Sequence, residues 1–93
     1  MNSPEIKAFI QENNHLFWYT PQNKKEDIGP EFLVETILNY GDIGAVRKLF
    51  RIMGIKKVAE IFFNSINSSQ RRRSNYNELT INFFTLVFNR YAS

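Results

Sequence analysis

Residues 42–66 read DIGAVRKLFRIMGIKKVAEIFFNSI, and this stretch decides the fold class. Its apolar residues recur at the spacing of one helical face, first over 43–53 and again over 55–66. They are Ile43, Val46, Leu49, Phe50 and Met53 in the first run, and Ile55, Val58, Ala59, Ile61, Phe62 and Ile66 in the second. Asp42 is placed to cap the first run, and Gly54 separates the two runs in the manner of a helix end. The stretch therefore predicts two consecutive amphipathic helices.

The segments before residue 42 predict two further helices. Ser3 followed by Pro4 is typical of a helix start. This helix is expected to fray before an aromatic segment, residues 15–19, that packs against the core, and Thr20-Pro21 begins a polar loop over 20–29. Gly29-Pro30 starts the next helix. It is expected to end at Tyr40-Gly41, where glycine can adopt the left-handed conformation.

The C-terminal segment predicts the last helix after a polar stretch over 67–77. Asn75 stands three residues before Glu78, which resembles a capping box. Leu79, Phe83, Leu86, Val87 and Tyr91 mark one helical face, which Ile81, Phe84 and Phe88 widen. Residues 80–88 also have the composition of a strand, but no other segment offers a partner strand. We therefore predict a helix, apolar nearly all round and central in the core.

The composition indicates one globular domain and excludes several classes of site. The chain has 93 residues, of which 43% are hydrophobic, with no cysteine and one histidine, His15. This excludes disulfides, a thiol nucleophile and cysteine-based zinc sites. The acidic pairs Glu26/Asp27 and Glu31/Glu35 fall in a solvated loop and on a solvated helix face, so we predict no enzyme and no cofactor. No segment has the pattern of a membrane span or a signal peptide, and we expect a cytoplasmic protein.

The formal charge of +3 is unevenly divided. Residues 1–46 carry three basic against seven acidic residues, a net −4, and residues 47–93 carry nine against two, a net +7. Such a basic half suits an anionic partner, either nucleic acid or an acidic protein face. The candidate contact residues are Arg71, Arg72, Arg73, Lys56, Lys57, Arg47, Lys48 and Arg51. The triplet 71–73 is expected to lie in an exposed loop.

Residues 46–64 invite comparison with a helix-turn-helix, a motif in which two helices pack closely around a turn glycine. Phe50 occupies a position where alanine is common, and Glu60 stands where a buried aliphatic residue is expected. Both departures argue against a working helix-turn-helix.

Several segments taken in order carry a family resemblance. They are Leu16-Phe17-Trp18, FLVETILNYGD at 32–42, Leu49-Phe50, Gly54-Ile55-Lys56-Lys57-Val58, Arg71-Arg72-Arg73 and Asn82-Phe83-Phe84-Thr85-Leu86-Val87-Phe88. The chain resembles a family of small uncharacterised bacterial all-helical proteins over about residues 16–90. We divide its single domain, residues 1–93, into an N-terminal helix extension (1–15) and a family-like core (16–91). The resemblance implies no catalytic residue. Because such proteins are often encoded beside nucleotidyltransferase-like toxins, it implies an antitoxin-like or defence-associated role.

Taken together, the chain is predicted to be a small all-α domain of about five short helices that acts as a non-enzymatic protein-interaction module. Nine Phe, four Tyr and one Trp are more aromatic residues than a core of this size needs, and exposed aromatic residues are favoured at interfaces. We expect a protein partner or a homo-oligomer, without membrane or small-molecule substrate. Nucleic-acid binding through the basic C-terminal half is the alternative.

Overall fold

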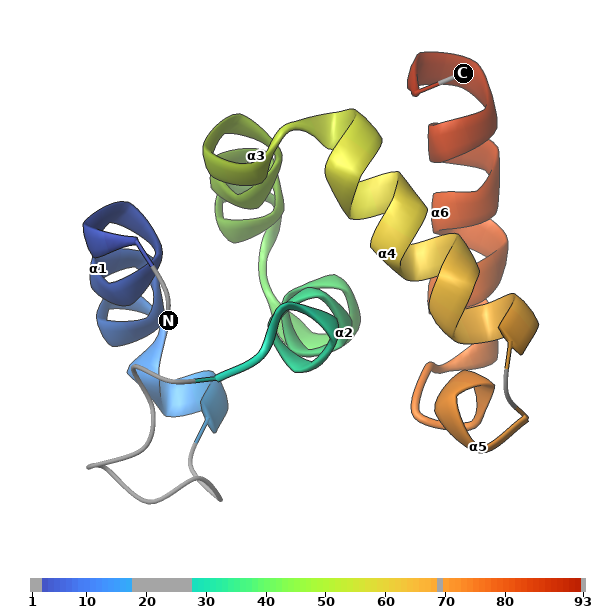
Figure 1. Ribbon diagram of the computed structural model, residues 1–93, viewed down its shortest axis with the longest axis horizontal. Coiled ribbons are helices and arrows are strands. Elements are labelled where there is room, and N and C mark those ends of the chain that lie inside the picture. Colours follow the sequence, from blue (N-terminus) through green and yellow to red (C-terminus); the bar gives the residue numbers. More distant parts are fainter. Residues whose placement is uncertain (1–2, 18–27, 69, 93) are drawn as a thin grey trace.

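The computed structural model describes residues 3–17, 28–68 and 70–92, except for the side chain of Arg72 (Figure 1). Every regular element in these ranges is a helix. The elements are α1 (Pro4–Glu12), the 3₁₀-helix η1 (Asn14–Phe17), α2 (Pro30–Tyr40), α3 (Ile43–Met53), α4 (Ile55–Ser68), α5 (Gln70–Arg73) and α6 (Glu78–Tyr91). Five of these helices have nine or more residues, so the prediction of an all-α domain of about five short helices is confirmed.

The predicted helix starts are confirmed for α1, α2 and α3. The hydroxyl of Ser3 accepts a hydrogen bond from the backbone N–H of Ile6 at 3.2 Å, with Pro4 in the first turn. Asp42 Oδ1 accepts one from the N–H of Ala45 at 2.8 Å. These oxygens satisfy N–H groups that a helix start would otherwise leave without partners.

Two glycines end helices for different reasons. Gly54 has a φ of 88°, a conformation that favours glycine over other residues, and it alone separates α3 from α4. Gly41 ends α2 as predicted, but its left-handed conformation was wrongly predicted, because its φ is −73°. Glycine is required there by space, since a Cβ at residue 41 would lie 2.7 Å from the carbonyl oxygen of Ile37.

The aromatic segment after α1 is only partly as predicted. Phe17 is fully buried and its ring meets that of Phe32 edge-on at a centroid distance of 6.1 Å. His15, which belongs to the segment predicted to pack against the core, is exposed. In a 3₁₀-helix with three residues per turn, a residue two positions before a buried one points away from the core. The predicted packing of Trp18, the stop at Thr20-Pro21 and the pair Glu26/Asp27 lie outside the described residues.

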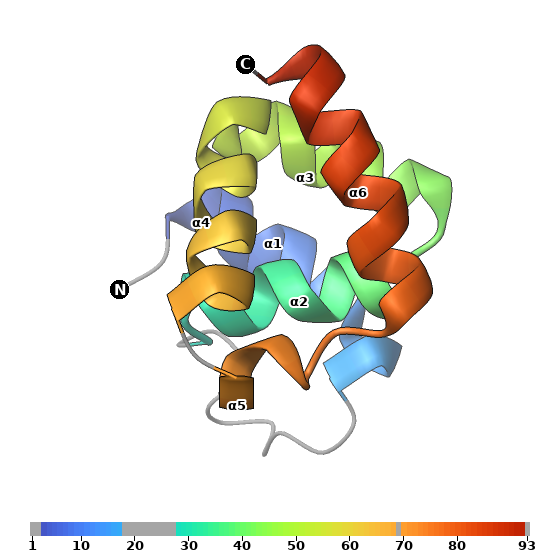
Figure 2. The ribbon, with the colours of Figure 1, turned by 90° about the vertical axis from the view of Figure 1, so that its right-hand side faces the viewer.

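Helix α2 occupies the middle of the bundle, with α3, α4 and α6 packed around it (Figures 1 and 2). It buries Leu33, Val34, Thr36, Ile37 and Leu38. A cluster of aromatic rings fills the space between α4 and α6, where the ring of Phe62 meets those of Tyr76 and Phe88 at centroid distances of 5.2 and 5.3 Å. The core therefore joins the middle and the C-terminal half of the chain, and Phe9, Ile10 and Phe17 extend it to the N-terminal elements.

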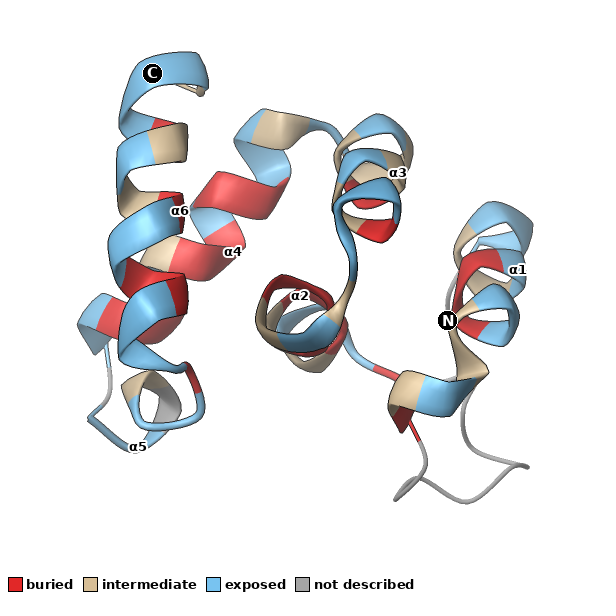
Figure 3. Ribbon diagram, turned by 180° about the vertical axis from the view of Figure 1, so that it is seen from behind, coloured by how far each residue is buried: buried red, intermediate tan, exposed pale blue. Residues whose placement is uncertain are grey.

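Helix α6 is a helix as predicted, but its central position was wrongly predicted. It packs on α2 and α4 through Ile81, Phe84 and Phe88 and leaves its other face exposed, as Figure 3 shows. The residues that were predicted to widen its buried face are thus the buried ones, whereas Leu79, Phe83, Leu86 and Tyr91 are exposed. A helix at the edge of a bundle has one face that contacts no other helix. When apolar residues occur on every face, as in α6, the sequence does not show which face that is.

The polar stretch before α6 also differs from the prediction. Arg71 and its neighbours form one helical turn, α5, rather than a loop. The predicted capping box at Asn75 and Glu78 is wrong, because α6 has Asn77 as its N-cap and no cap from a side chain of its own segment. The cap comes from α2, where Asn39 Oδ1 accepts a hydrogen bond from the N–H of Asn77.

Candidate functional site: an apolar groove

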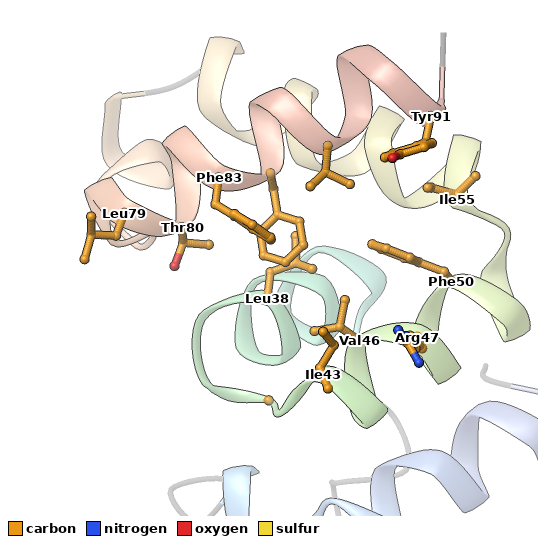
Figure 4. Close-up of a pocket in the computed structure, with 13 residues that line it drawn as sticks. Leu38, Ile43, Val46, Arg47, Phe50, Ile55, Leu79, Thr80, Phe83 and Tyr91 are labelled. Carbon is orange, nitrogen blue, oxygen red and sulfur yellow. The ribbon is translucent and has the colours of Figure 1, made fainter.

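An open groove of about 650 Å³ runs between α6 and the end of α2, α3 and the start of α4 (Figure 4). Its lining is formed by Leu38, Gly41, Ile43, Val46, Arg47, Phe50, Ile55, Leu79, Thr80, Phe83, Phe84, Val87 and Tyr91. Nearly all of these side chains are apolar. A surface hollow of this size and character has the properties of a site that receives apolar groups.

One wall of the groove is a face of α6. Leu79, Phe83, Val87 and Tyr91 follow one another at intervals of four residues and therefore lie along one side of the helix. Leu79 is 83% exposed and Phe83 is 59% exposed, and because both line the same groove they form part of one exposed apolar patch.

The opposite wall comes from α3. Asp42 caps this helix and so sets its start, which places Ile43 at the mouth of the groove with 71% of its surface exposed. Figure 4 shows Phe50 and Phe83 pointing into the groove from its two walls. The ring of Phe50 meets those of Phe84 and Phe88 edge-on at centroid distances of 6.4 and 5.7 Å, so the groove floor is continuous with the aromatic core.

Charge is sparse in the groove. Arg47 is the only charged residue that lines it within the described part of the chain, and no carboxylate there pairs with its guanidinium. At the far end of α6, the Arg90 guanidinium lies 5.6 Å from the centroid of the Tyr91 ring, a cation–π distance. The groove therefore offers positive charge at its rim and apolar surface within.

The eight predicted basic residues do not form one patch. Arg47 and Arg51 are exposed on α3, and Lys48 of the same helix pairs with Glu12 of α1 at 2.6 Å. Lys56 and Lys57 are exposed in the first turn of α4, with Lys57 Nζ 3.9 Å from a Glu60 oxygen. Arg71, Arg72 and Arg73 lie on α5, of which Arg71 is exposed and Arg73 half-buried. The fourteen residues of α4, about 20 Å in length, separate the α5 arginines from the other group.

Two of the buried hydroxyls in the core lack a polar partner within the described ranges. Thr36 Oγ1 and the Tyr76 hydroxyl are buried and have no hydrogen-bond partner among the described residues. Burial, and to a lesser extent the negative charge of Glu35, raise the pKa of Tyr76 above its ordinary value. These hydroxyls face the packed interior rather than the groove, so they bear on stability and not on binding.

The fold and the groove define the protein as a small all-α domain with an open apolar surface between α3 and α6. No family model, curated protein or solved structure matches the chain. None of the helices in the described ranges has the length and hydropathy to cross a bilayer. The described residues also hold no group of three or more His, Asp or Glu side chains that could bind a metal ion.

Sequence reasoning found the basic residues but missed the groove. Of the eight predicted contact residues, only Arg47 lines it. The signal for the groove was present in the surplus of aromatic residues and in the all-round apolar character of residues 79–91. The aromatic surplus predicts an interface without locating it, and the apolar character of residues 79–91 was assigned to the core, because only the tertiary arrangement shows which face of α6 has no neighbour.

Proposed function

We propose that this protein is a non-enzymatic protein-interaction module that binds an apolar helical surface in the groove between α3 and α6. The observation that carries the proposal is the exposure of Leu79, Phe83 and Ile43 around a single hollow. Monomeric soluble proteins rarely leave large contiguous apolar surfaces uncovered, and such surfaces are typical of binding sites.

The shape of the groove favours a helix as its ligand. Both walls are helices, and α6 presents its side chains at four-residue intervals, the periodicity that a ligand helix matches with its own apolar stripe. Arg47 at the rim adds a preference for an acidic side chain beside that stripe. The expected ligand is thus an amphipathic helix with an acidic edge.

The family resemblance extends this proposal to an antitoxin-like role, in which the groove covers part of a toxin-like protein encoded nearby. The apolar groove is compatible with that role and carries no feature specific to it. The identity of the partner is therefore tested separately from the use of the groove.

The absence of cysteine from the chain allows a sharp test. Ile43→Cys places a single thiol at the mouth of the groove, and Lys57→Cys places one on the exposed side of α4 as a matched control. Each variant is labelled with a polarity-sensitive fluorophore and titrated with the product of the neighbouring gene and, separately, with unlabelled chain. We expect a blue shift at position 43 with at least one of the two and no shift at position 57. Equal responses at both positions, or none at either, would contradict the proposal.

Nucleic-acid binding stays a prediction that the arrangement of the basic residues does not strengthen, since they are split between the two ends of α4. The two residues that depart from the helix-turn-helix pattern do not pack as that motif requires. Glu60 is exposed to solvent, and Phe50 lines the groove. A mobility shift with random duplex at low salt, repeated with Arg71→Ala and Arg73→Ala, tests this alternative. A shift that is lost in these variants and with rising salt would support it.

A further inference from the structure

The exposed side of α6 carries a row of four residues, called the ridge below. The intervals between them are the same whether the helix is followed from its N-terminus or from its C-terminus. Leu79, Phe83, Leu86 and Arg90 follow one another at intervals of four, three and four residues, which places them on one line along the helix. Leu86 is 71% exposed and does not line the groove. A ligand held by the groove alone would leave Leu86 uncovered, so the ridge requires a further explanation.

We propose that the occupant of the groove is a second copy of this chain, with the two α6 helices antiparallel about a two-fold axis. This inference rests on the proposed function, in which the groove is the binding site. An axis that passes between residues 84 and 85 places Phe83 opposite Leu86 of the second copy, and Leu79 opposite Arg90 of the second copy. The same contacts are made twice because the spacing of the ridge is symmetric. Such self-complementarity is what a two-fold interface requires.

The charges of α6 favour the antiparallel arrangement. Its only charged residues are Glu78 in the first turn and Arg90 in the last, and neither forms an ion pair with any described residue. In the antiparallel pair, each Glu78 lies beside Arg90 of the second copy, at both ends of the contact. A parallel pair would place like charges together and align the two helix dipoles unfavourably.

The groove accommodates the second helix beside the first. Leu79 and Phe83 belong both to the ridge and to the groove wall, so the ridge borders the groove directly. When the second α6 lies along this border with its ridge against the first ridge, the side of that helix next to the ridge covers the mouth of the groove near Ile43. Each copy contributes one ridge and one groove, and the contact covers the exposed apolar residues of both walls.

Sedimentation velocity over a dilution series tests the proposal. We expect a concentration-dependent dimer for the natural chain and its loss in Leu86→Glu, because this change places a charge in the middle of the helix pair. Asn64→Glu adds the same charge at an exposed position of α4 and should leave the dimer intact. Leu86 is exposed, so the variant is expected to fold, and circular dichroism checks that it does.

A pair of charge reversals tests the antiparallel geometry. Glu78→Lys alone and Arg90→Glu alone each replace two attractive contacts by two repulsive ones, and each should raise the dimer Kd about tenfold. An equimolar mixture of the two variants restores opposite charges at both ends, so a heterodimer of nearly natural affinity is expected. A loss of stability of α6 would not be rescued by mixing.

Three results would overturn the inference. They are a natural chain that stays monomeric at every concentration reached, a dimer indifferent to Leu86→Glu, and charge variants that mixing does not rescue. If the chain is monomeric but the label at position 43 still responds to another protein, the second copy is excluded as occupant and the groove remains the binding site. If position 43 responds to nothing while the chain dimerises, the proposed use of the groove fails and the dimer forms elsewhere.

Discussion

Asn39 of α2 holds the start of α6 through the two ends of its amide. Its Oδ1 accepts a hydrogen bond from the N–H of Asn77 at 3.1 Å, and its Nδ2 donates one to the carbonyl oxygen of Asn75 at 2.9 Å. The contact spans 38 residues and caps a helix that has no side-chain cap of its own. Since α2 and α6 form opposite sides of the groove at this end, Asn39 also sets where the groove wall begins.

We expect Asn39→Ala to lower the free energy of unfolding by about 1–2 kcal/mol, because it leaves a helix-start N–H and a carbonyl without their partner. Urea denaturation measures the change. Asn64→Ala is the matched control, since Asn64 is exposed on α4 and its side chain makes no hydrogen bond within the described ranges. Equal effects of the two substitutions would show that Asn39 does not cap α6 in solution.

Substitution of Gly41 at the end of α2 is expected to lower the stability of the fold. Gly41→Ala would bring a Cβ to 2.7 Å from the carbonyl oxygen of Ile37, closer than such atoms approach without backbone movement. We expect a loss of more than about 1 kcal/mol, measured by thermal unfolding. At Gly29 the nearest atom to an added Cβ is a side-chain oxygen at 3.7 Å, so Gly29→Ala should cost less. A reversed order of the two variants would contradict the described end of α2.

Tyr76 predicts a pH dependence at the alkaline end. Burial, with a smaller contribution from Glu35, raises its pKa in the folded state above the ordinary value of about 10. Above that pH the unfolded chain releases the phenolic proton while the folded chain keeps it, so the unfolded state is favoured as pH rises. The free energy of unfolding should therefore fall above about pH 10, by up to about 1.4 kcal/mol per pH unit.

The Tyr76→Phe variant isolates this contribution from that of the lysines. The difference in unfolding free energy between the natural chain and the variant should be constant below about pH 9 and should shift in favour of the variant above pH 10. Denaturation titrations at a series of pH values measure it. Parallel profiles of the two proteins would mean that Tyr76 is not buried as described.

Much of the fold could be predicted because its signals are local. Asp42 caps α3 through a residue only three positions away, and Gly54 ends the same helix by its own backbone conformation. A pattern read along the chain contains both pieces of information. The apolar face of α4 was predicted correctly for the same reason, because its buried residues follow one helical stripe.

The start of α6 and the groove could not be predicted, because they depend on residues far apart in the sequence. Nothing near Asn77 indicates that its cap is Asn39. In α6, apolar residues occupy both the buried and the exposed face, so hydropathy alone assigned the wrong face to the core. The basic residues were easy to find, but their separation by the length of α4 is a property of the fold.

The adjacent residues Phe83 and Phe84 provide the most direct test of how α6 is oriented. Phe83 is 59% exposed at the groove, whereas Phe84 is 6% exposed and its ring meets those of Phe50 and Phe88. Phe84→Ala should lower the free energy of unfolding by about 3–5 kcal/mol, the cost of a cavity in a packed core, and Phe83→Ala by less than about 1 kcal/mol. For binding, the order is reversed, because Phe83→Ala removes one side chain of the α6 wall and should weaken the complex while the fold persists. Chemical denaturation and the fluorescence titration at position 43, carried out on the same two variants, separate the effects. Similar losses of stability in both variants would mean that α6 is buried on both faces, and the groove as a binding surface would then have to be abandoned.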